Sequence, residues 1–152
     1  MKKILYCFGA IALLSACNQK TEKIESNDPV TSTVTNTSQT DFSGLYNYQQ
    51  NGDTITLQLT VDGTKASGNL LYALNEKDRN SGSFVGEIKD GVLLANYTFS
   101  SEGILSERQI AFKLTDTSAV EGYGDVQEIN GKMVFKDAAN LEYGTDLVLT
   151  KK

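Results

Sequence analysis

Five dipeptides that end in glycine punctuate residues 41–152, and they constrain the fold of this chain more than any other feature. Asn-Gly and Asp-Gly suit type I′ turns, in which both central residues have positive φ, and these turns join antiparallel strands. Between the dipeptides, apolar and polar residues alternate with a period of two, which is typical of strands that bury one face. We therefore predict an all-β domain. The five dipeptides are Asn51-Gly52, Asp62-Gly63, Asp90-Gly91, Glu102-Gly103 and Asn130-Gly131.

The expected hairpins have registers that can be compared with the apolar pattern. With two-residue turns at the third and fourth dipeptides, Phe84 lies opposite Tyr97, and Tyr97 lies opposite Arg108. A loop over 77–81 places Leu74 opposite Phe84. In each hairpin the apolar side chains share one face, although a slip by one residue would have reversed them. This agreement predicts an antiparallel up-and-down meander with strands near 42–49, 53–61, 65–76, 82–89, 92–100, 104–114, 119–129, 132–136 and 146–150.

A meander of this length leaves two exposed edges unless it closes. The last apolar run, 147–149, is placed to pair with the first strand, 42–49. Closure of eight or nine strands gives a small barrel whose interior is filled by side chains or holds one small ligand. An open β-sandwich of two sheets is the alternative. Five glycines assigned to inward positions would permit tight curvature: Gly44, Gly68, Gly86, Gly122 and Gly124.

Two resemblances accompany this pattern. The opening Gly44-x-Tyr46 strand and the short hairpins resemble the calycin-type barrels, which include lipocalins, fatty-acid-binding proteins and avidins. That likeness concerns the architecture of residues 42–150 alone, and the tryptophan usual in the first lipocalin strand is absent, so no binding residue is carried over. The stretches EKDRNSG (76–82) and SEGILSERQIAF (101–112) resemble small uncharacterised envelope lipoproteins of bacteria, which implies a location and no activity.

The N-terminus has the parts of an export signal. Two lysines precede an apolar stretch over 4–14 that is too short to span a bilayer as a stable helix. The following Leu-Ser-Ala-Cys17 resembles the lipobox of bacterial lipoproteins, which implies cleavage before Cys17 and its lipidation with a diacylglycerol and usually a third acyl chain. Several acyl chains anchor a protein stably to a membrane. An ordinary secretory signal is the alternative, and Asn18 favours the outer membrane because Asp is the inner-membrane signal of enteric bacteria.

The chain therefore divides into three parts. We expect a lipoprotein signal peptide over 1–16, the lipidated cysteine and a disordered tether over 17–40, and the barrel domain over 41–152. The tether is rich in Thr, Ser and Asn and has few aliphatic residues, so it cannot bury enough apolar surface to offset the entropy of ordering.

Composition excludes several function classes. The chain has no histidine and two cysteines, of which Cys7 leaves with the signal peptide and Cys17 carries lipid. A disulfide, most metal sites and every imidazole-dependent catalytic triad are thereby excluded, and we expect no metal and no cofactor. The net charge of −5 becomes more negative once the two N-terminal lysines are removed, so nucleic acid is not an expected partner.

Alternate loops of a meander share one end of the barrel, and one end would collect both arginines of the chain, Arg79 and Arg108. Arg108 lies on the inward face, with Tyr97 in reach of a cation–π contact. Two interpretations stay open. Either Arg108 pairs with an inward-facing Glu76 as a polar plug above a solid core, or the barrel holds a cavity in which Arg108 binds an anion. The tyrosines expected to line that cavity are Tyr46, Tyr48, Tyr72 and Tyr97.

We predict a non-enzymatic binding or interaction module of the cell envelope, anchored in the outer membrane, that takes a small ligand or an envelope protein at its charged end. A purely structural lipoprotein with a solid core is the alternative. A remote alternative is a carboxylate-based hydrolase that uses Glu102 with Glu107, or Glu76 with Asp78. The candidate ligand-binding residues are Arg108, Tyr97, Glu76, Tyr72, Tyr48, Tyr46 and Arg79, and no residue is assigned a catalytic role.

Overall fold

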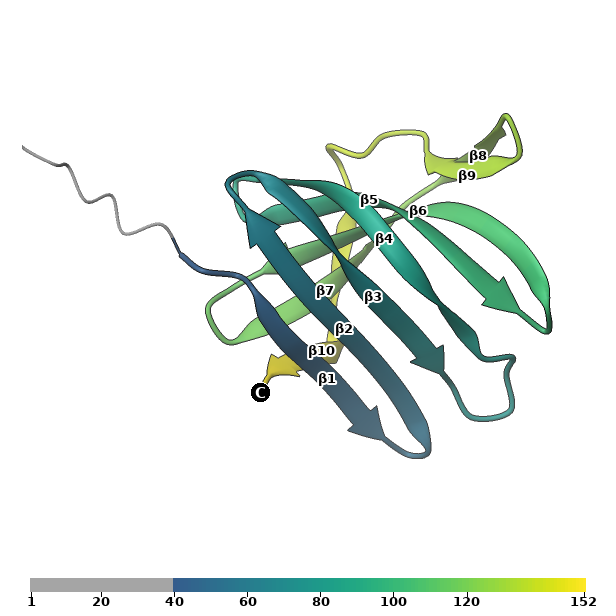
Figure 1. The fold of residues 1–152 in the computed structure, drawn as a ribbon, viewed down its shortest axis with the longest axis horizontal. Helices are drawn as coiled ribbons and strands as arrows, with labels where there is room; N and C mark the ends of the chain where they lie inside the picture. Colours follow the sequence, from purple (N-terminus) through teal and green to yellow (C-terminus); the bar gives the residue numbers. More distant parts are fainter. Residues whose placement is uncertain (1–39) are drawn as a thin grey trace, which may run out of the picture. The chain divides into compact units, whose positions relative to one another are not determined.

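The computed structural model describes residues 40–152, which form ten β-strands (Figure 1). Each strand from β1 to β6 pairs antiparallel with the next, and β10 lies between β7 and β1. Eight strands, β1–β7 and β10, therefore close into an antiparallel meander barrel, as predicted. The strands are β1 (Gly44–Gln50), β2 (Asp53–Asp62), β3 (Lys65–Ala73), β4 (Asn80–Lys89), β5 (Val92–Ser101), β6 (Ile104–Leu114), β7 (Ser118–Tyr123), β8 (Val126–Ile129), β9 (Lys132–Phe135) and β10 (Glu142–Lys151).

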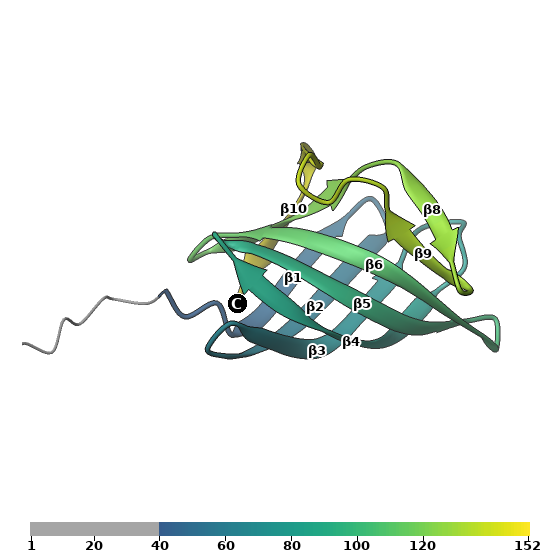
Figure 2. The ribbon, with the colours of Figure 1, turned by 90° about the horizontal axis from the view of Figure 1, so that it is seen from above.

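Closure rests on two strand pairs. The first strand pairs with the last, and Tyr46 lies opposite Lys151, which confirms the predicted contact between the two ends of the domain. β5 pairs with β6 along its whole length, from Val92 opposite Lys113 to Ser101 opposite Ile104. Because no gap interrupts this circuit, the two-sheet sandwich is excluded. Figure 2 shows β5 and β6 on one side of the barrel and β1 and β2 on the other.

Four of the five glycine dipeptides form the expected turns. The residue before glycine has a φ of 53° at Asn51, 52° at Asp90, 49° at Glu102 and 52° at Asn130, and the glycine after each also has a positive φ. At the remaining dipeptide, Asp62-Gly63, the turn is shifted by one position, because Asp62 still belongs to β2 and pairs with Lys65. The loop there has positive φ only at its first central residue, a glycine, as in a type II′ turn.

The register between β3 and β4 was predicted wrongly. Phe84 lies opposite Gly68, six residues from the expected Leu74. The reason is that β3 ends at Ala73, where the Asp53 carboxylate accepts the Asn75 amide N–H at 2.6 Å and begins the loop early. Six is an even number, so the same side chains face inward, and the predicted interior survives the error. The registers of Phe84 with Tyr97 and of Tyr97 with Arg108 are confirmed.

The predicted strand 119–129 is two strands. β7 ends at Tyr123, and β8 forms a hairpin with β9 that lies outside the closed wall, beside β6 (Figure 2). β9 pairs in parallel with β6, with Arg108 opposite Met133. The inward position in β7 is Glu121, which lies opposite Phe112, so the assignment of Gly122 to the inward face was wrong.

Side chains fill the middle of the barrel. Among the largest fully buried side chains are Leu57, Phe84, Leu93 and Phe112. At Gly86 the wall bends so closely that a Cβ atom would overlap the carbonyl oxygen of Leu94. The interior therefore has the solid packing expected of a small barrel.

The expected signal peptide, the lipid-bearing Cys17 and almost all of the tether lie outside the described residues. Within residues 40–152, there is no helix of the length and apolar character that a membrane crossing needs.

Candidate ligand-binding site

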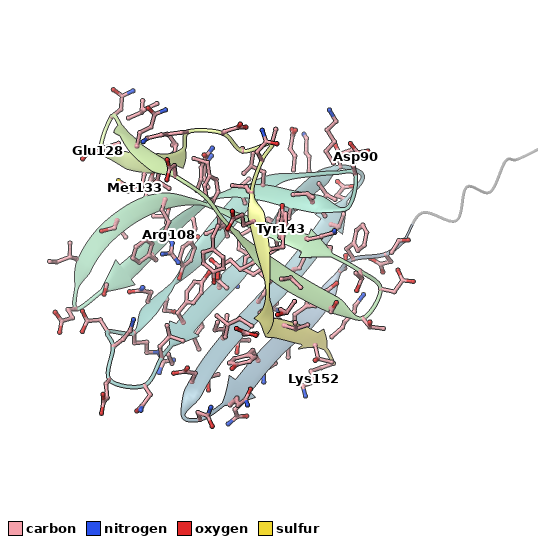
Figure 3. All side chains as sticks on the ribbon, turned by 180° about the vertical axis from the view of Figure 1, so that it is seen from behind. Asp90, Arg108, Glu128, Met133, Tyr143 and Lys152 are labelled. Carbon is pink, nitrogen blue, oxygen red and sulfur yellow. The ribbon has the colours of Figure 1, made fainter. Side chains whose placement is uncertain are left out.

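One end of the barrel holds a pocket of about 520 Å³ at its mouth. Three loops lie at this end: the β1–β2 and β5–β6 hairpin turns and the longer β3–β4 loop. Arg108 of β6, labelled in Figure 3, lines the pocket. A volume of this size is far larger than the space of a few waters, each of which occupies about 30 Å³ in the liquid. The lining residues are Tyr72, Leu74, Lys77, Asp78, Asn80, Phe99, Ser101, Arg108, Glu121 and Tyr123.

Three aromatic rings surround the Arg108 guanidinium. Its central carbon lies 5.0 Å from the ring centroid of Tyr72, 5.7 Å from that of Tyr97 and 5.5 Å from that of Phe99. The Nε atom is buried and has no hydrogen-bond partner. Among the residues that the structure describes, the guanidinium also forms no ion pair within 4.0 Å. Arg108 is thus a partly buried cation whose hydrogen-bonding capacity the protein does not satisfy.

Glu121 also lines the pocket, and it is only 8 % exposed. Its Oε1 accepts a hydrogen bond from the Tyr72 hydroxyl at 2.6 Å, and its Oε2 accepts one from the Tyr123 hydroxyl at 3.2 Å. Burial raises the pKa of the Glu121 carboxyl, and the Tyr72 hydrogen bond, the charge of Arg108 and the Tyr123 hydrogen bond oppose that rise. The two tyrosines therefore hold the carboxylate without a direct Arg108 contact.

Tyr97 forms the floor of the site. Its ring stacks on Phe99 with centroids 4.9 Å apart and meets Tyr72 edge-on at 6.2 Å. Its hydroxyl donates to the Leu70 carbonyl at 2.8 Å, and burial raises the pKa of Tyr97 to about 12. Burial, followed by the nearby charge of Glu121, raises the pKa of Tyr72 as well. Both phenols are consequently neutral at physiological pH, and their rings present fixed faces to Arg108.

The structure brings together only some of the residues named from the sequence. Arg108 and Tyr72 line the pocket, and Tyr97 lies beneath it. Tyr46 is buried away from the pocket, and its hydroxyl donates to the Phe42 carbonyl at 2.7 Å. Tyr48 is half-buried, and its hydroxyl donates to Gln50. The predicted lining by Tyr46 and Tyr48 was therefore wrong.

The predicted partner of Arg108 was also wrong. Glu76 lies in the β3–β4 loop, is exposed, and has a φ of 56°, because β3 ends before it reaches this residue. Arg79 is exposed in the same loop, at the same end of the barrel as Arg108, since the next residue, Asn80, pairs with Ser101. Neither Glu76 nor Arg79 lines the pocket.

The acid pairs considered for hydrolysis do not face a common cleft. Glu102 lies in the exposed β5–β6 turn, and Glu107 points outward to Lys132, with 2.9 Å between Oε2 and Nζ. The hydrogen bond and charge of Lys132 lower the pKa of Glu107. Asp78 lies in the pocket, whereas Glu76 does not. Within residues 40–152, no cluster of three or more potential ligand side chains is arranged to hold a metal ion.

Sequence reasoning missed Glu121, Phe99 and Tyr123. Glu121 could have been found by pairing the strands on either side of the 115–117 loop, which places it opposite the inward-facing Phe112. Phe99 shares the inward face of Tyr97 two residues earlier, so the alternation rule also applies to it. Tyr123 had no such signal, because it lies where β7 leaves β6.

Comparison with known families gives one match. Residues 1–18 match the model of the prokaryotic membrane lipoprotein lipid attachment site, which agrees with the lipobox at Cys17. The chain is therefore a lipid-anchored membrane lipoprotein that carries a small, closed β-barrel. No curated protein and no solved structure matches the chain.

Proposed function

We propose that the barrel is a non-enzymatic binding module that holds a small organic anion in the mouth pocket, with Arg108 as the donor to the anion. The observation that carries this proposal is that Arg108 lines the mouth pocket and forms no ion pair within residues 40–152. A buried donor left unpaired costs about 1–3 kcal/mol, and a carboxylate provides acceptors that match the guanidinium in geometry and charge.

The surroundings of Arg108 favour an anion of low charge. Arg108 and Lys77 contribute two positive groups to the pocket, and Asp78 and Glu121 contribute two carboxyls. Such a balance favours a single carboxylate over a multiply charged phosphate. Phe99, Tyr72 and Leu74 supply an apolar wall. Apolar walls with a few convergent polar groups are the usual composition of small-molecule sites.

The proposal includes no chemical step. Glu121 is the one buried charged side chain within residues 40–152, and each of its oxygens accepts a hydrogen bond from a tyrosine hydroxyl. A carboxyl held in this way positions Tyr72 against Arg108. We further propose anchoring in the outer membrane, on the evidence of Asn18 after the lipidated cysteine.

The test is ligand-detected NMR with the full chain carrying Cys17→Ser, which prevents lipid attachment. Acetate, benzoate and inorganic phosphate serve as probes. We expect the carboxylates to bind and Arg108→Gln to weaken them by about ten- to a hundredfold, the range for loss of a hydrogen bond to a charged group. Arg79→Gln is the matched control, because Arg79 is exposed outside the pocket, and it should bind as the wild type does.

Two results would contradict the proposal. Absence of carboxylate binding by a folded wild-type chain would favour the purely structural role. Equal loss of binding in both arginine variants would show that general surface charge, and not the mouth pocket, attracts the anion.

A further inference from the structure

A second pocket, of about 260 Å³, lies where β6 and β7 separate. The two strands pair only from Phe112 opposite Glu121 to Leu114 opposite Ala119. Beyond that point β7 pairs only with β10, and the β8–β9 hairpin lies beside β6. The pocket between them is lined by Arg108, Gln109, Glu121, Gly122, Tyr123, Gly124, Val126, Met133 and Phe135.

This hairpin pocket adjoins the mouth pocket. Arg108, Glu121 and Tyr123 line both, so the same guanidinium borders two spaces of different character. The hairpin side contributes only apolar side chains, those of Val126, Met133 and Phe135. Met133 is the strand partner of Arg108, and Figure 3 labels the two close together, Arg108 on β6 and Met133 on the hairpin.

Polar contacts hold the hairpin in place, and its apolar side chains remain partly exposed. The Phe135 amide donates to Gln109 Oε1 at 2.9 Å, and Lys132 pairs with Glu107. Val126 remains 43 % exposed and Met133 39 % exposed. Exposed apolar surface beside a pocket with an unsatisfied charge is the pattern of a site for an amphiphile.

We propose that the ligand is a medium-chain carboxylate, whose carboxylate binds Arg108 and whose alkyl tail lies under the β8–β9 hairpin, outside the barrel. This inference rests on the proposed function and specifies its ligand. The tail does not enter the barrel, because Leu93 and Phe112 are fully buried and fill the interior. At about 30 Å³ for each group of water size, the hairpin pocket of about 260 Å³ holds roughly eight such groups, which is enough for the seven-carbon tail of octanoate.

Isothermal titration calorimetry on the same Cys17→Ser chain tests this assignment with butanoate, hexanoate and octanoate, all below their micelle concentrations. Burial of a methylene strengthens binding by up to about fourfold, so octanoate should bind at least about tenfold more tightly than butanoate. The double variant Val126→Ser/Met133→Ser should bind all three ligands as weakly as the wild type binds butanoate. Val85→Ser, at a residue 68 % exposed on β4, is the matched control and should keep the chain-length dependence.

The outcomes separate this inference from the proposed function. If butanoate binds through Arg108 but octanoate binds no more tightly, the tail assignment is wrong and the anion site stands. If the chain-length dependence persists in the double serine variant, the tail lies elsewhere and the assignment is again wrong. If no carboxylate binds to the wild type, both proposals are wrong.

Discussion

The substitution Arg108→Met tests whether the guanidinium stabilises the barrel or is kept at a cost for binding. Methionine retains an unbranched apolar body between Tyr72, Tyr97 and Phe99, and it removes the charge together with the buried Nε–H. The three ring contacts lie between 5.0 and 5.7 Å, and contacts of this kind contribute about 0.5–1 kcal/mol each. The substitution therefore loses about 2 kcal/mol of favourable interaction.

Relief of the unpaired donor opposes this loss. A buried N–H without an acceptor costs about 1–3 kcal/mol, so its removal recovers about 2 kcal/mol. The two contributions nearly cancel. We expect the free energy of unfolding of Arg108→Met to lie within about 1 kcal/mol of the wild-type value at pH 4, where Glu121 is largely protonated in the folded and unfolded states alike.

The comparison changes with pH because Arg108 is one of the groups that lower the pKa of Glu121. In the folded state that pKa lies above the ordinary 4.5, so the folded chain holds its proton more tightly than the unfolded chain does. The stability that protonated Glu121 contributes is therefore present at low pH and is lost as the pH rises through the folded pKa. Loss of Arg108 raises this pKa further, so the variant should fall below the wild type progressively above pH 4.5.

Urea denaturation followed by circular dichroism at pH 4 and pH 7.5 measures these differences. The double variant Arg108→Met/Glu121→Gln lacks the titrating group, and its stability relative to the wild type should not fall as the pH rises. A loss of more than about 3 kcal/mol by Arg108→Met at pH 4 would contradict the expected cancellation. It would mean that the cation holds the barrel together.

Three further outcomes follow from the same geometry. Burial raises the pKa of Tyr97 from 10.0 to about 12, so the stability that the neutral phenol contributes is complete below pH 10 and is lost as the pH rises to 12. Two pKa units correspond to about 2.7 kcal/mol. In urea titrations over this interval, Tyr97→Phe should therefore lose about that much less stability than the wild type. Glu121→Gln should gain stability relative to the wild type between pH 4 and pH 8, and a constant difference in denaturation midpoint would contradict the raised pKa. Gly86→Ala places a Cβ against the Leu94 carbonyl and should cost about 3 kcal/mol or more in thermal unfolding. The control Gly144→Ala, which meets no atom within 4 Å, should change stability by less than about 0.5 kcal/mol.

The part of the site built from neighbouring hairpins could be predicted from the sequence. The turn at Glu102-Gly103 has positive φ at both residues, which sets the register of β5 with β6 and places Tyr97 opposite Arg108. Alternation then directs both side chains inward. Their contact was predictable because a two-residue turn leaves no freedom in pairing.

Contacts made across longer loops were not predictable in the same way. Glu76 was expected beside Arg108 because the alternating pattern continues past Ala73. The strand stops at Ala73 because the Asp53 carboxylate, in another strand, accepts the Asn75 amide N–H. A side-chain contact between residues 22 positions apart has no signature in local alternation.

The lipid attachment site, the four tight turns and the inward face of most strands follow from the amino-acid sequence alone. Each of these features depends on residues that are close together in the chain: a short motif, a turn with positive φ, or an alternation with a period of two. The tertiary contacts alone account for the separation of β7 from β6, the end of β3 before Glu76, and the position of the β8–β9 hairpin beside Arg108. These features depend on closure of the barrel, which brings together strands whose pairing no local preference encodes.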